Sequence, residues 1–425
     1  MAAPTFQSLK GMHDLLPPDS ERWLHLIGRF AEHFGRAGYG LVQTPILEDL
    51  AVFARVGEGT DVVTKEMYDF EDRDGKRIAL RPESTAGVAR SFIQHRPLSP
   101  WKVWYSSQHF RHENTQAGRY RQHHQLGAEC FGSDHPDIDV ELIVGLWDFY
   151  TRGLGLSRIR LEVNSIGDPA TRTSYQAELR SYLESRLDEL HPTDRPKVER
   201  NPLRVLDTKF VESAPVVEAA PRLVDHLSDS DRERYALVTA GLDEAGVPYV
   251  QNPRLVRGLD YYTHTVFEII SEALDSAQAT IGGGGRYDGL VEALGGPSTP
   301  AFGFGSGIER VLLACDAEGL LPVAQFALDA FIVSFDRNEV DARNVVLELR
   351  RAGVGADRAL NQHNPRKQGD RARRARARFI VRLGKEASAP GLVEVVDEAD
   401  GSTHEVPRAA LAESIAALLA ASSRT

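Results

Sequence analysis

The chain has 425 residues, of which 42% are hydrophobic and 26% are charged. This balance is typical of a globular protein with a sizeable core, and it excludes intrinsic disorder, collagen and coiled coil. At roughly 150 residues per domain, the length predicts about three domains. The net charge of −11 argues against a generally basic protein that coats nucleic acid.

We expect a cytosolic protein without a membrane-spanning segment. The sequence has no uncharged apolar run long enough to cross a bilayer, and its N-terminus lacks the basic and apolar regions of a secretory signal. Cys130 and Cys315 cannot form a disulfide framework, and no CxxC motif exists to hold zinc.

Hydrophobic periodicity predicts the elements of the first 167 residues. In chain order they are a helix at 21–38, a strand at 77–80, a helix at 84–95, a hairpin of strands 103–110 and 121–131, a helix at 137–151 and a strand at 159–163. Hairpins and helices alternate without a regular βαβ pattern. We therefore predict an α/β (α+β) catalytic domain built on an antiparallel sheet.

The pattern changes after residue 167 and again near residue 325. Residues 168–250 are mostly helical in pattern, including 175–190 and 215–227, and we interpret them as an insertion. Strands at 255–270 and 280–281 and helices at 286–294 and 307–318, each after a glycine-rich turn, return to the first domain. A linker leads to strand 330–334, helix 339–352, strands 379–383 and 392–396, and helix 408–420. The predicted domains are 1–167, 168–250, 251–322 and 328–425.

Charge separates the last domain from the rest. Residues 326–425 hold 16 Lys and Arg against 14 Asp and Glu, a net +2, whereas the first 325 residues hold 34 against 47, a net −13. An acidic body with a slightly basic final domain is compatible with a polyanionic partner that contacts part of the surface.

Common signatures of phosphate binding and hydrolysis are absent. The sequence contains no GxxxxGK[ST], GxGxxG, HExxH or GxSxG motif. A P-loop or Rossmann nucleotide site is therefore not expected, and a nucleotide would have to be held by side chains.

The predicted hairpin FRHENTQAGRYRQHHQLGAECFG carries one polar and one apolar face. Because strand side chains alternate, the polar face receives Arg121, His123, Gln125 and Glu129, and the apolar face receives Leu126, Ala128 and Cys130. Arg111 and Glu113 follow the first strand. A solvent-exposed sheet face is the alternative, but arginine forks onto phosphate, and carboxylates suit ammonium and amino groups. The set favours a nucleotide together with a cationic small molecule.

Three further segments could contribute to such a site. LVRGLDYYTHTVFEI contains Arg257, Tyr261 and Tyr262; IGGGGRYDGL contains four consecutive glycines; and AFGFGSGIERVLL places Arg310 early in a helix. Each has a structural alternative: tyrosine pairs commonly edge a core, glycines form flexible turns, and a helical arginine is commonly a surface charge.

Taken together, these segments resemble the histidyl-tRNA synthetases, a family of class II aminoacyl-tRNA synthetases. The resemblance runs from about Lys10 to the C-terminus. RGLDYY and GGGGRYD are typical of the histidine enzymes, whereas FRHE and GFGSGIER follow patterns shared by class II synthetases. It implies a class II catalytic domain, a helical insertion, a C-terminal α/β anticodon-binding domain and a homodimer, with Pro45 at the motif 1 interface. The implied reaction converts L-histidine and ATP, accompanied by Mg²⁺, to histidyl-adenylate and then to histidyl-tRNA(His).

The resemblance also implies residue roles. Arg111 would hold the α-phosphate and the histidine carboxylate. Arg257 would contact the bound histidine and stabilise the charge that develops on the α-phosphate. For ATP, Glu113 would accept from the adenine amino group, His123 would stack on the adenine, and Arg119 and Arg310 would bind the outer phosphates. For histidine, Glu83, Thr85 and Gln125 would hold the α-amino group, Glu129 and Tyr262 would read the imidazole, and Tyr261 and Tyr287 would close the pocket.

The sequence departs from the family pattern in several places, including the loop ENTQAG and the loosely matching C-terminal segment GKEASAPG. His123 stands where phenylalanine is usual, Ala117 replaces a lysine in the loop between the hairpin strands, and Ser84 replaces a glycine in RPESTAG.

Two other functions are open to a chain with these motifs. A regulatory paralogue would bind histidine and control histidine biosynthesis, but it would lack RGLDYY, Arg310 and the final domain. A class II synthetase for threonine or proline would leave Glu129 and RGLDYY unexplained.

The final domain contains a basic run. Residues 366–378 hold seven Lys and Arg against one acid, Asp370. If the run is helical, Lys367, Arg371, Arg374 and Arg378 share a face. A solvated helix face is the alternative; we predict that Lys367, Arg371 and Arg374 contact tRNA.

Overall fold

The computed structural model describes residues 6–57, 62–206, 208–255, 261–275, 279–335, 338–384 and 391–422. Two compact units divide the chain, Met1–Pro322 and Val323–Thr425. Each is described separately below.

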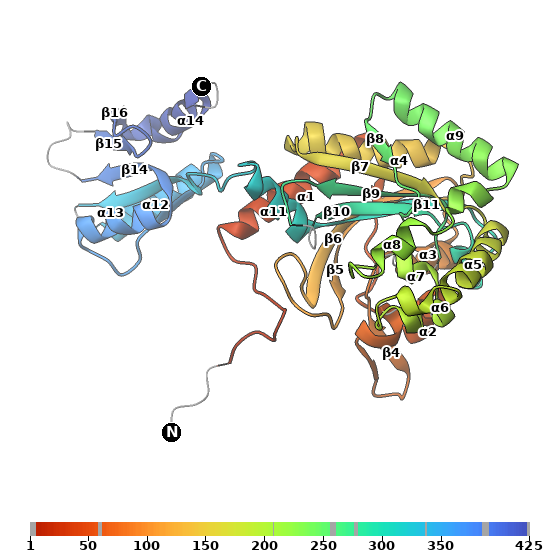
Figure 1. The fold of residues 1–425 in the computed structure, drawn as a ribbon. Coiled ribbons are helices and arrows are strands. Elements are labelled where there is room, and N and C mark those ends of the chain that lie inside the picture. The colour runs from red at the N-terminus through yellow and green to blue at the C-terminus, as the bar shows by residue number, and fades with distance from the viewer. Residues whose placement is uncertain are drawn as a thin grey trace. The chain divides into compact units, whose positions relative to one another are not determined.

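An eight-stranded sheet forms the centre of the first unit in the described part of the chain, with the order β1-β5-β6-β11-β10-β9-β7-β8 (Figure 1). Its strands are β1 (Gly40–Leu41), β5 (Trp101–Phe110), β6 (Gln122–Phe131), β7 (Ile159–Ser165), β8 (Tyr249–Gln251), β9 (Thr263–Ser271), β10 (Thr280–Arg286) and β11 (Ala301–Gly307). The six central strands pair antiparallel, and only the edge pairs β1–β5 and β7–β8 are parallel. The predicted antiparallel sheet is confirmed.

The predicted hairpin is the pair β5–β6. In its register, Val103 lies opposite Glu129, Ser107 opposite Gln125 and His109 opposite His123. Directly opposed residues of an antiparallel pair project from the same face. The polar face predicted from β6 therefore continues onto β5.

Four helices cover the other face of this sheet. They are α1 (Asp19–Arg36), α4 (Asp137–Asp148), α9 (Asp229–Glu244) and α11 (Ile308–Ala317). Their buried side chains share one hydrophobic cluster with Leu126, Ala128 and Cys130, so the predicted apolar face of β6 is confirmed. In α1, Leu26, Phe30 and Phe34 recur at helical spacing and are all buried.

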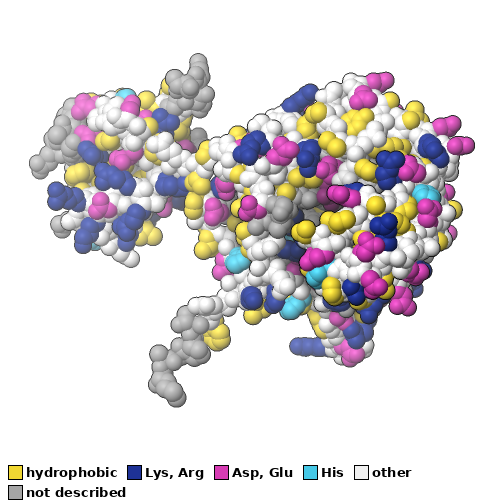
Figure 2. Space-filling view, viewed as in Figure 1, with side chains coloured by type: hydrophobic (Ala, Val, Ile, Leu, Met, Phe, Trp, Pro, Cys, Tyr) yellow, Lys and Arg dark blue, Asp and Glu magenta, His cyan; other side chains and the backbone are white. Residues whose placement is uncertain are grey.

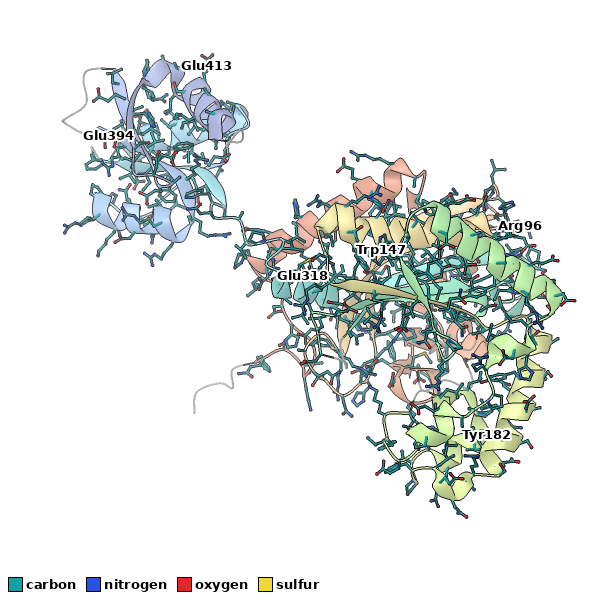
Figure 3. The ribbon with its side chains drawn as sticks, turned by 45° about the horizontal axis from the view of Figure 1, so that its top comes forward. Arg96, Trp147, Tyr182, Glu318, Glu394 and Glu413 are labelled. Atoms are coloured by element: carbon teal, nitrogen blue, oxygen red, sulfur yellow. The ribbon has the colours of Figure 1, made fainter. Side chains whose placement is uncertain are left out.

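The polar face of the sheet is bordered by α3 (Thr85–His95) and by the helices that follow β7. These are α5 (Pro169–Glu184), η3 (Leu187–Glu189), α6 (Arg195–Arg200), α7 (Leu203–Leu206), α8 (Ala214–Glu218) and η4 (Leu223–His226). Side chains from α3, α5, α6, α7, α8 and η4 share a second hydrophobic cluster. The Tyr182 hydroxyl of α5 donates to the Val216 carbonyl of α8 at 2.8 Å (Figure 3). The helix predicted over 215–227 is interrupted, because α8 and η4 are separate turns.

Smaller elements complete the first unit. A three-stranded antiparallel sheet has the order β2-β4-β3. The elements are β2 (Leu47–Asp49), α2 (Leu50–Gly57), η1 (Val62–Glu66), β3 (Asp69–Glu71), β4 (Arg77–Leu80), η2 (Phe149–Leu154) and α10 (Leu290–Ala293).

The four consecutive glycines do not form the predicted turn. Gly282–Gly285 lie inside β10, between β9 and β11. A Cβ built on Gly284 would lie 2.0 Å from the Gly303 carbonyl oxygen of β11. Only glycine permits this close approach. The predicted helix 286–294 accordingly shrinks to the single turn α10, and Arg286 ends the strand.

The second unit is an α/β domain. Its five-stranded sheet has the order β13-β12-β14-β15-β16 in the described residues. The elements are β12 (Leu328–Ser334), α12 (Glu339–Arg351), β13 (Ala356–Arg358), α13 (Pro365–Arg374), β14 (Ala377–Leu383), β15 (Leu392–Asp397), β16 (Thr403–Pro407), η5 (Arg408–Ala410) and α14 (Leu411–Ser422). Helices α12 and α14 pack on one face of the sheet, and α13 packs on the other.

Candidate active site

A buried glutamate lies at the centre of the polar face. Glu129 of β6 has no exposed surface. Its Oε1 accepts a hydrogen bond from the Thr85 hydroxyl at 2.8 Å, and its Oε2 accepts one from the Tyr287 hydroxyl. Burial raises the pKa of Glu129 to about 8, against the opposing effect of these hydrogen bonds. The carboxyl group is therefore mostly protonated at neutral pH.

Space for this carboxylate comes from a glycine on the neighbouring strand. Gly303 of β11 lies opposite Glu129, and a Cβ at this position would lie 1.5 Å from Oε2. Any other residue would displace the Glu129 side chain. The alternating glycines of AFGFGSG thus belong to the site rather than to a turn before α11.

Aromatic side chains surround the glutamate. The ring centroid of Tyr261 lies 4.7 Å from that of Tyr262 and 5.7 Å from that of Tyr287. Both Tyr262 and Tyr287 are buried. The tyrosine pair therefore lies beside Glu129, as the resemblance implied, although it also packs against the second hydrophobic cluster.

Tyr105 is a site residue that the sequence analysis missed. It projects from β5 on the polar face, opposite Gly127, where a Cβ would lie 2.2 Å from Tyr105 Cζ. Burial, followed by the charges of Glu129 and Glu83, raises the Tyr105 pKa well above its ordinary value. The alternation of strand side chains could have identified Tyr105, because residues 105, 107 and 109 share a face with His123 and Glu129.

Glu83 stands at the start of α3. Its two carboxylate oxygens accept backbone hydrogen bonds from Thr85 at 2.5 Å and from Ala86 at 2.9 Å. Burial raises its pKa, and these backbone bonds and the Arg111 charge oppose the increase. Glu83 therefore stabilises the N-terminus of α3, in addition to lying beside Thr85.

Positive charge gathers at the other end of the polar face. Glu113 forms an ion pair with Arg119, and its Oε1 lies 3.9 Å from Arg111 Nη1. Arg310 of α11 donates to the Gly118 carbonyl at 3.1 Å and to the Thr280 carbonyl at 3.0 Å. Burial and the nearby Arg119 lower the pKa of Arg310. This concentration of guanidinium groups suits a polyphosphate.

The remaining predicted residues divide into two groups. Gln125 lies on the same face, with its Oε1 2.8 Å from where a Cβ on Gly305 would be. His123 is half-buried, and burial followed by the Arg111 charge lowers its pKa to about 3. Arg257 falls outside the described residues, so its predicted role stays a prediction.

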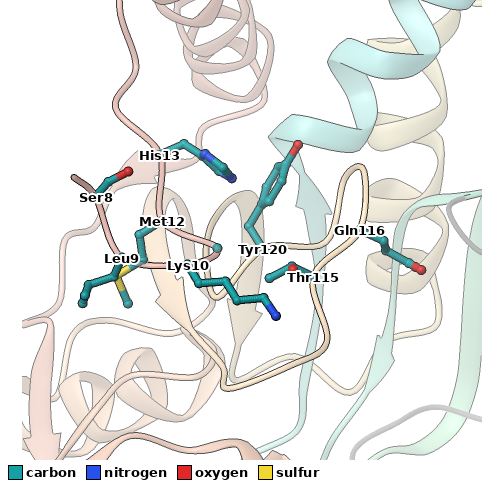
Figure 4. A pocket seen from close by; sticks show the side chains of 9 residues that line it. Ser8, Leu9, Lys10, Met12, His13, Thr115, Gln116 and Tyr120 are labelled. Atoms are coloured by element: carbon teal, nitrogen blue, oxygen red, sulfur yellow. The ribbon is translucent and has the colours of Figure 1, made fainter.

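An N-terminal arm packs on the loop between the hairpin strands. The Gly11 carbonyl accepts from the backbone N–H groups of Arg121 at 2.9 Å and Gln122 at 3.1 Å, and the His13 ring lies edge-on to Tyr120. A cavity of about 400 Å³ lies between the arm and this loop (Figure 4). The arm therefore supports the loop that carries Glu113 and Arg119.

The predicted basic surface lies in the second unit. Helix α13 exposes Lys367, Arg371 and Arg374, and no carboxylate among the described residues pairs with them. Lys and Arg side chains gather on this unit in Figure 2. Arg378 was wrongly assigned to the same helical face: the helix ends at Arg374, and Arg378 lies on β14, where it pairs with Asp397 at 3.0 Å.

No helix among the described residues has both the length and the apolar character needed to span a bilayer. No group of three or more His, Cys, Asp or Glu side chains in that part of the chain could hold a metal ion.

Known proteins resemble the chain over nearly its whole length. A family model described as "Histidyl-tRNA synthetase" matches residues 11–311, and one described as "Anticodon binding domain" matches residues 329–418. A "Histidine--tRNA ligase" of Saccharopolyspora erythraea is 45% identical, covering 95% of this chain and 96% of the relative. One of Corynebacterium urealyticum is 44% identical, covering 97% and 96%. The crystal structure of apo S. aureus histidyl-tRNA synthetase has a TM-score of 0.80 at 34% identity, covering 97% of this chain and all of that one.

Proposed function

This chain belongs to the histidyl-tRNA synthetase family, and we propose how its polar sheet face performs the reaction of that family. The enzyme is a histidine–tRNA ligase, which joins histidine to tRNA at the expense of ATP. The observation that carries the residue assignment is the buried Glu129, which accepts hydrogen bonds from Thr85 and Tyr287. The other end of the same sheet face carries the arginines around Glu113.

Glu129 and Tyr262 read the imidazole of histidine. The Tyr262 hydroxyl oxygen accepts from the N–H of one ring nitrogen, and the other ring nitrogen shares one proton with Glu129. A protonated carboxyl group donates to the neutral ring, and an ionised one accepts from an imidazolium. An amino acid without ring nitrogens would leave the proton of the buried Glu129 carboxyl group without an acceptor, although Thr85 and Tyr287 still donate to its oxygens. The cost of such an unpaired polar group is the basis of selection. Tyr261 and Tyr287 enclose the ring.

The α-amino group of histidine is held by Glu83, Thr85 and Gln125. Glu83 already accepts two backbone hydrogen bonds, and a carboxylate has further acceptor capacity for an ammonium group. Arg111 holds the histidine carboxylate against the α-phosphate. Its Nε donates to the Pro82 carbonyl at 2.8 Å, which orients its guanidinium group from the residue next to Glu83.

ATP occupies the positively charged end. Arg119 and Arg310 bind the outer phosphates, His123 stacks on the adenine, and Glu113 accepts from the adenine amino group. Glu113 pairs with Arg119, and ATP binding would replace this ion pair with contacts to the adenine amino group and the outer phosphates. We propose that Mg²⁺ arrives bound to the triphosphate. Attack of a histidine carboxylate oxygen on the α-phosphorus then releases pyrophosphate, and Arg111 and Arg257 stabilise the added negative charge.

The second unit binds tRNA(His) through the exposed cations of α13, Lys367, Arg371 and Arg374. The terminal ribose of the tRNA then attacks the carbonyl carbon of the adenylate and AMP leaves. We also propose a homodimer. Leu41, Ile46, Leu47 and Phe70 are exposed near Pro45, and burial of such apolar side chains favours association. Use of ATP and tRNA supports a cytoplasmic location.

Amino-acid-dependent ATP–pyrophosphate exchange tests the assignment. We expect exchange with histidine and at least about 10⁴-fold less with the other amino acids, the scale of rejection by a site with buried polar groups. Equal exchange with threonine or proline would refute the specificity. Binding of histidine without any exchange would instead support the regulatory paralogue.

A further inference from the structure

Three polar side chains, Ser84, His109 and His123, contact one another in that order. The Ser84 hydroxyl and Nε2 of His109 are hydrogen-bonded at 2.7 Å. The rings of His109 and His123 lie 5.4 Å apart, centroid to centroid, at an interplanar angle of 71°. His109 therefore contacts both Ser84 and His123.

His109 is an unusual residue for its surroundings. It has no exposed surface, and its Nδ1 has no hydrogen-bond partner among the described residues. Burial, followed by the neighbouring His123 and Arg111, holds the pKa of His109 well below its ordinary value, so the ring is neutral. A neutral imidazole with one satisfied nitrogen depends strongly on that single hydrogen bond, because breaking it would leave both nitrogens unpaired in the interior.

Ser84 provides a rigid attachment for this ring. It lies in the segment 81–84, which is hydrogen-bonded to β5 and its continuation at several points. The Arg81 carbonyl accepts from the Phe110 N–H at 3.0 Å, Arg81 Nε donates to the Gln108 carbonyl at 2.7 Å, and Arg111 Nε donates to the Pro82 carbonyl at 2.8 Å. The Ser84–His109 bond therefore fixes the ring against a segment that cannot easily move.

We propose that His109 is a positioning residue, held by Ser84, that sets the orientation of the His123 ring for stacking on adenine. The inference rests on the proposed function for the identity of the nucleotide. The edge of one imidazole against the face of the other restricts rotation of the His123 ring, which is only half-buried. Stacking depends on ring orientation, so loss of this support should weaken ATP binding rather than the chemical step.

A double-mutant cycle on ATP affinity tests the proposal. Ser84→Ala should raise both the ATP dissociation constant, measured by titration calorimetry without histidine, and the KM for ATP in exchange by about 3–10-fold, the scale of one hydrogen bond. The kcat for exchange should change less than the KM. His109→Leu should have a similar effect, whereas His109→Gln, whose amide can bond Ser84, should retain most of the affinity. In a His123→Phe background, Ser84→Ala should have almost no effect on ATP affinity.

Ser106→Ala is the matched control. Ser106 lies on β5, the strand that carries His109, but its side chain projects from the opposite face of the sheet. If Ser84→Ala fails to fold, as judged by thermal unfolding, the comparison of His109→Leu with His109→Gln replaces it. Equal effects of Ser84→Ala in the wild-type and His123→Phe backgrounds, or no effect in the wild-type background, would overturn the proposal. A wild type that binds ATP but supports no histidine-dependent exchange would instead refute the proposed function, and the affinity cycle would still decide the role of His109.

Discussion

The Tyr287 hydroxyl donates a hydrogen bond to Glu129, and both side chains are almost wholly withdrawn from solvent, at 1% and 0% exposed. Tyr287 follows β10 and Glu129 lies on β6, with β11 between these two strands. The bond stabilises the ionised form of Glu129 and opposes the effect of burial. This balance determines how histidine affinity depends on pH.

Histidine should bind most tightly between pH 6.5 and 8. Free imidazole has a pKa of about 6.5, and the Glu129 pKa is about 8. In that window Glu129 holds one proton and the substrate ring none, which is the total that the bound pair requires. Below pH 6.5 the pair must release a proton when histidine binds, and above pH 8 the pair must take up a proton. The histidine dissociation constant, measured by calorimetry, should therefore rise by up to about tenfold per pH unit beyond each limit.

Tyr287→Phe separates this effect from titration of the substrate amino group. Because the Tyr287 hydrogen bond lowers the pKa of Glu129, its removal should raise that pKa and shift the alkaline limit to higher pH. The amino group of histidine would give a limit that does not move. A histidine affinity independent of pH from 7.5 to 8.8 in the wild type would contradict the shared proton.

Arg310→Gln should raise the KM for ATP by about 10–100-fold, because a charge-assisted hydrogen bond to phosphate is lost. The KM for histidine should change little. ATP–pyrophosphate exchange at varied ATP and histidine concentrations measures both. Arg152→Gln is the control, since Arg152 is 79% exposed and pairs only with Asp148 among the described residues. An unchanged KM for ATP would remove Arg310 from the phosphate site.

Arg257→Ala should slow adenylate formation by about 10²–10³-fold, the scale of losing one preorganised donor to the transition state. Histidine and ATP affinities should change much less, because the interaction strengthens as charge develops on the α-phosphate. Single-turnover formation of the adenylate measures the step. A wild-type rate in a variant with intact circular dichroism would exclude Arg257 from the mechanism.

Replacing Lys367, Arg371 and Arg374 by Gln should weaken tRNA binding and flatten its dependence on salt. Each phosphate contact adds about 0.7–0.9 to the slope of log affinity against log salt, so the slope should fall by about two. Arg373→Gln is the matched control on the same helix, because Arg373 pairs with Asp370 at 3.7 Å and Glu398 at 3.1 Å. Histidine-dependent exchange should be unaffected. An unchanged slope would show that this face is only solvated.

Local patterns in the sequence were sufficient to locate the helices and strands whose form depends little on contacts with distant segments. The spacing of Leu26, Phe30 and Phe34 identified α1, and alternation identified β5 and β6 to within two residues. Alternation also separated Glu129 from Ala128 and Cys130, because a strand has only two faces. Chemical roles, by contrast, came from the resemblance of whole motifs and not from spacing.

Contacts between distant segments decided the rest. Gly282–Gly285 form a central strand rather than a turn, because β9 and β11 approach too closely for side chains. Four consecutive glycines in a sequence do not reveal this close approach. The basic run of α13 ends at Arg374 because Arg378 pairs in the sheet.

The sequence by itself determined the family, the two faces of the hairpin and the side chains available for chemistry. Only the tertiary structure decided that Ser84 bonds His109, that His109 adjoins His123, and that Tyr287 reaches Glu129. Along the chain, Ser84 and His109 are 25 residues apart, His109 and His123 are 14 apart, and Glu129 and Tyr287 are 158 apart. Local propensity acts over a few neighbouring residues, whereas burial and hydrogen bonding between such partners depend on the packing of the whole sheet.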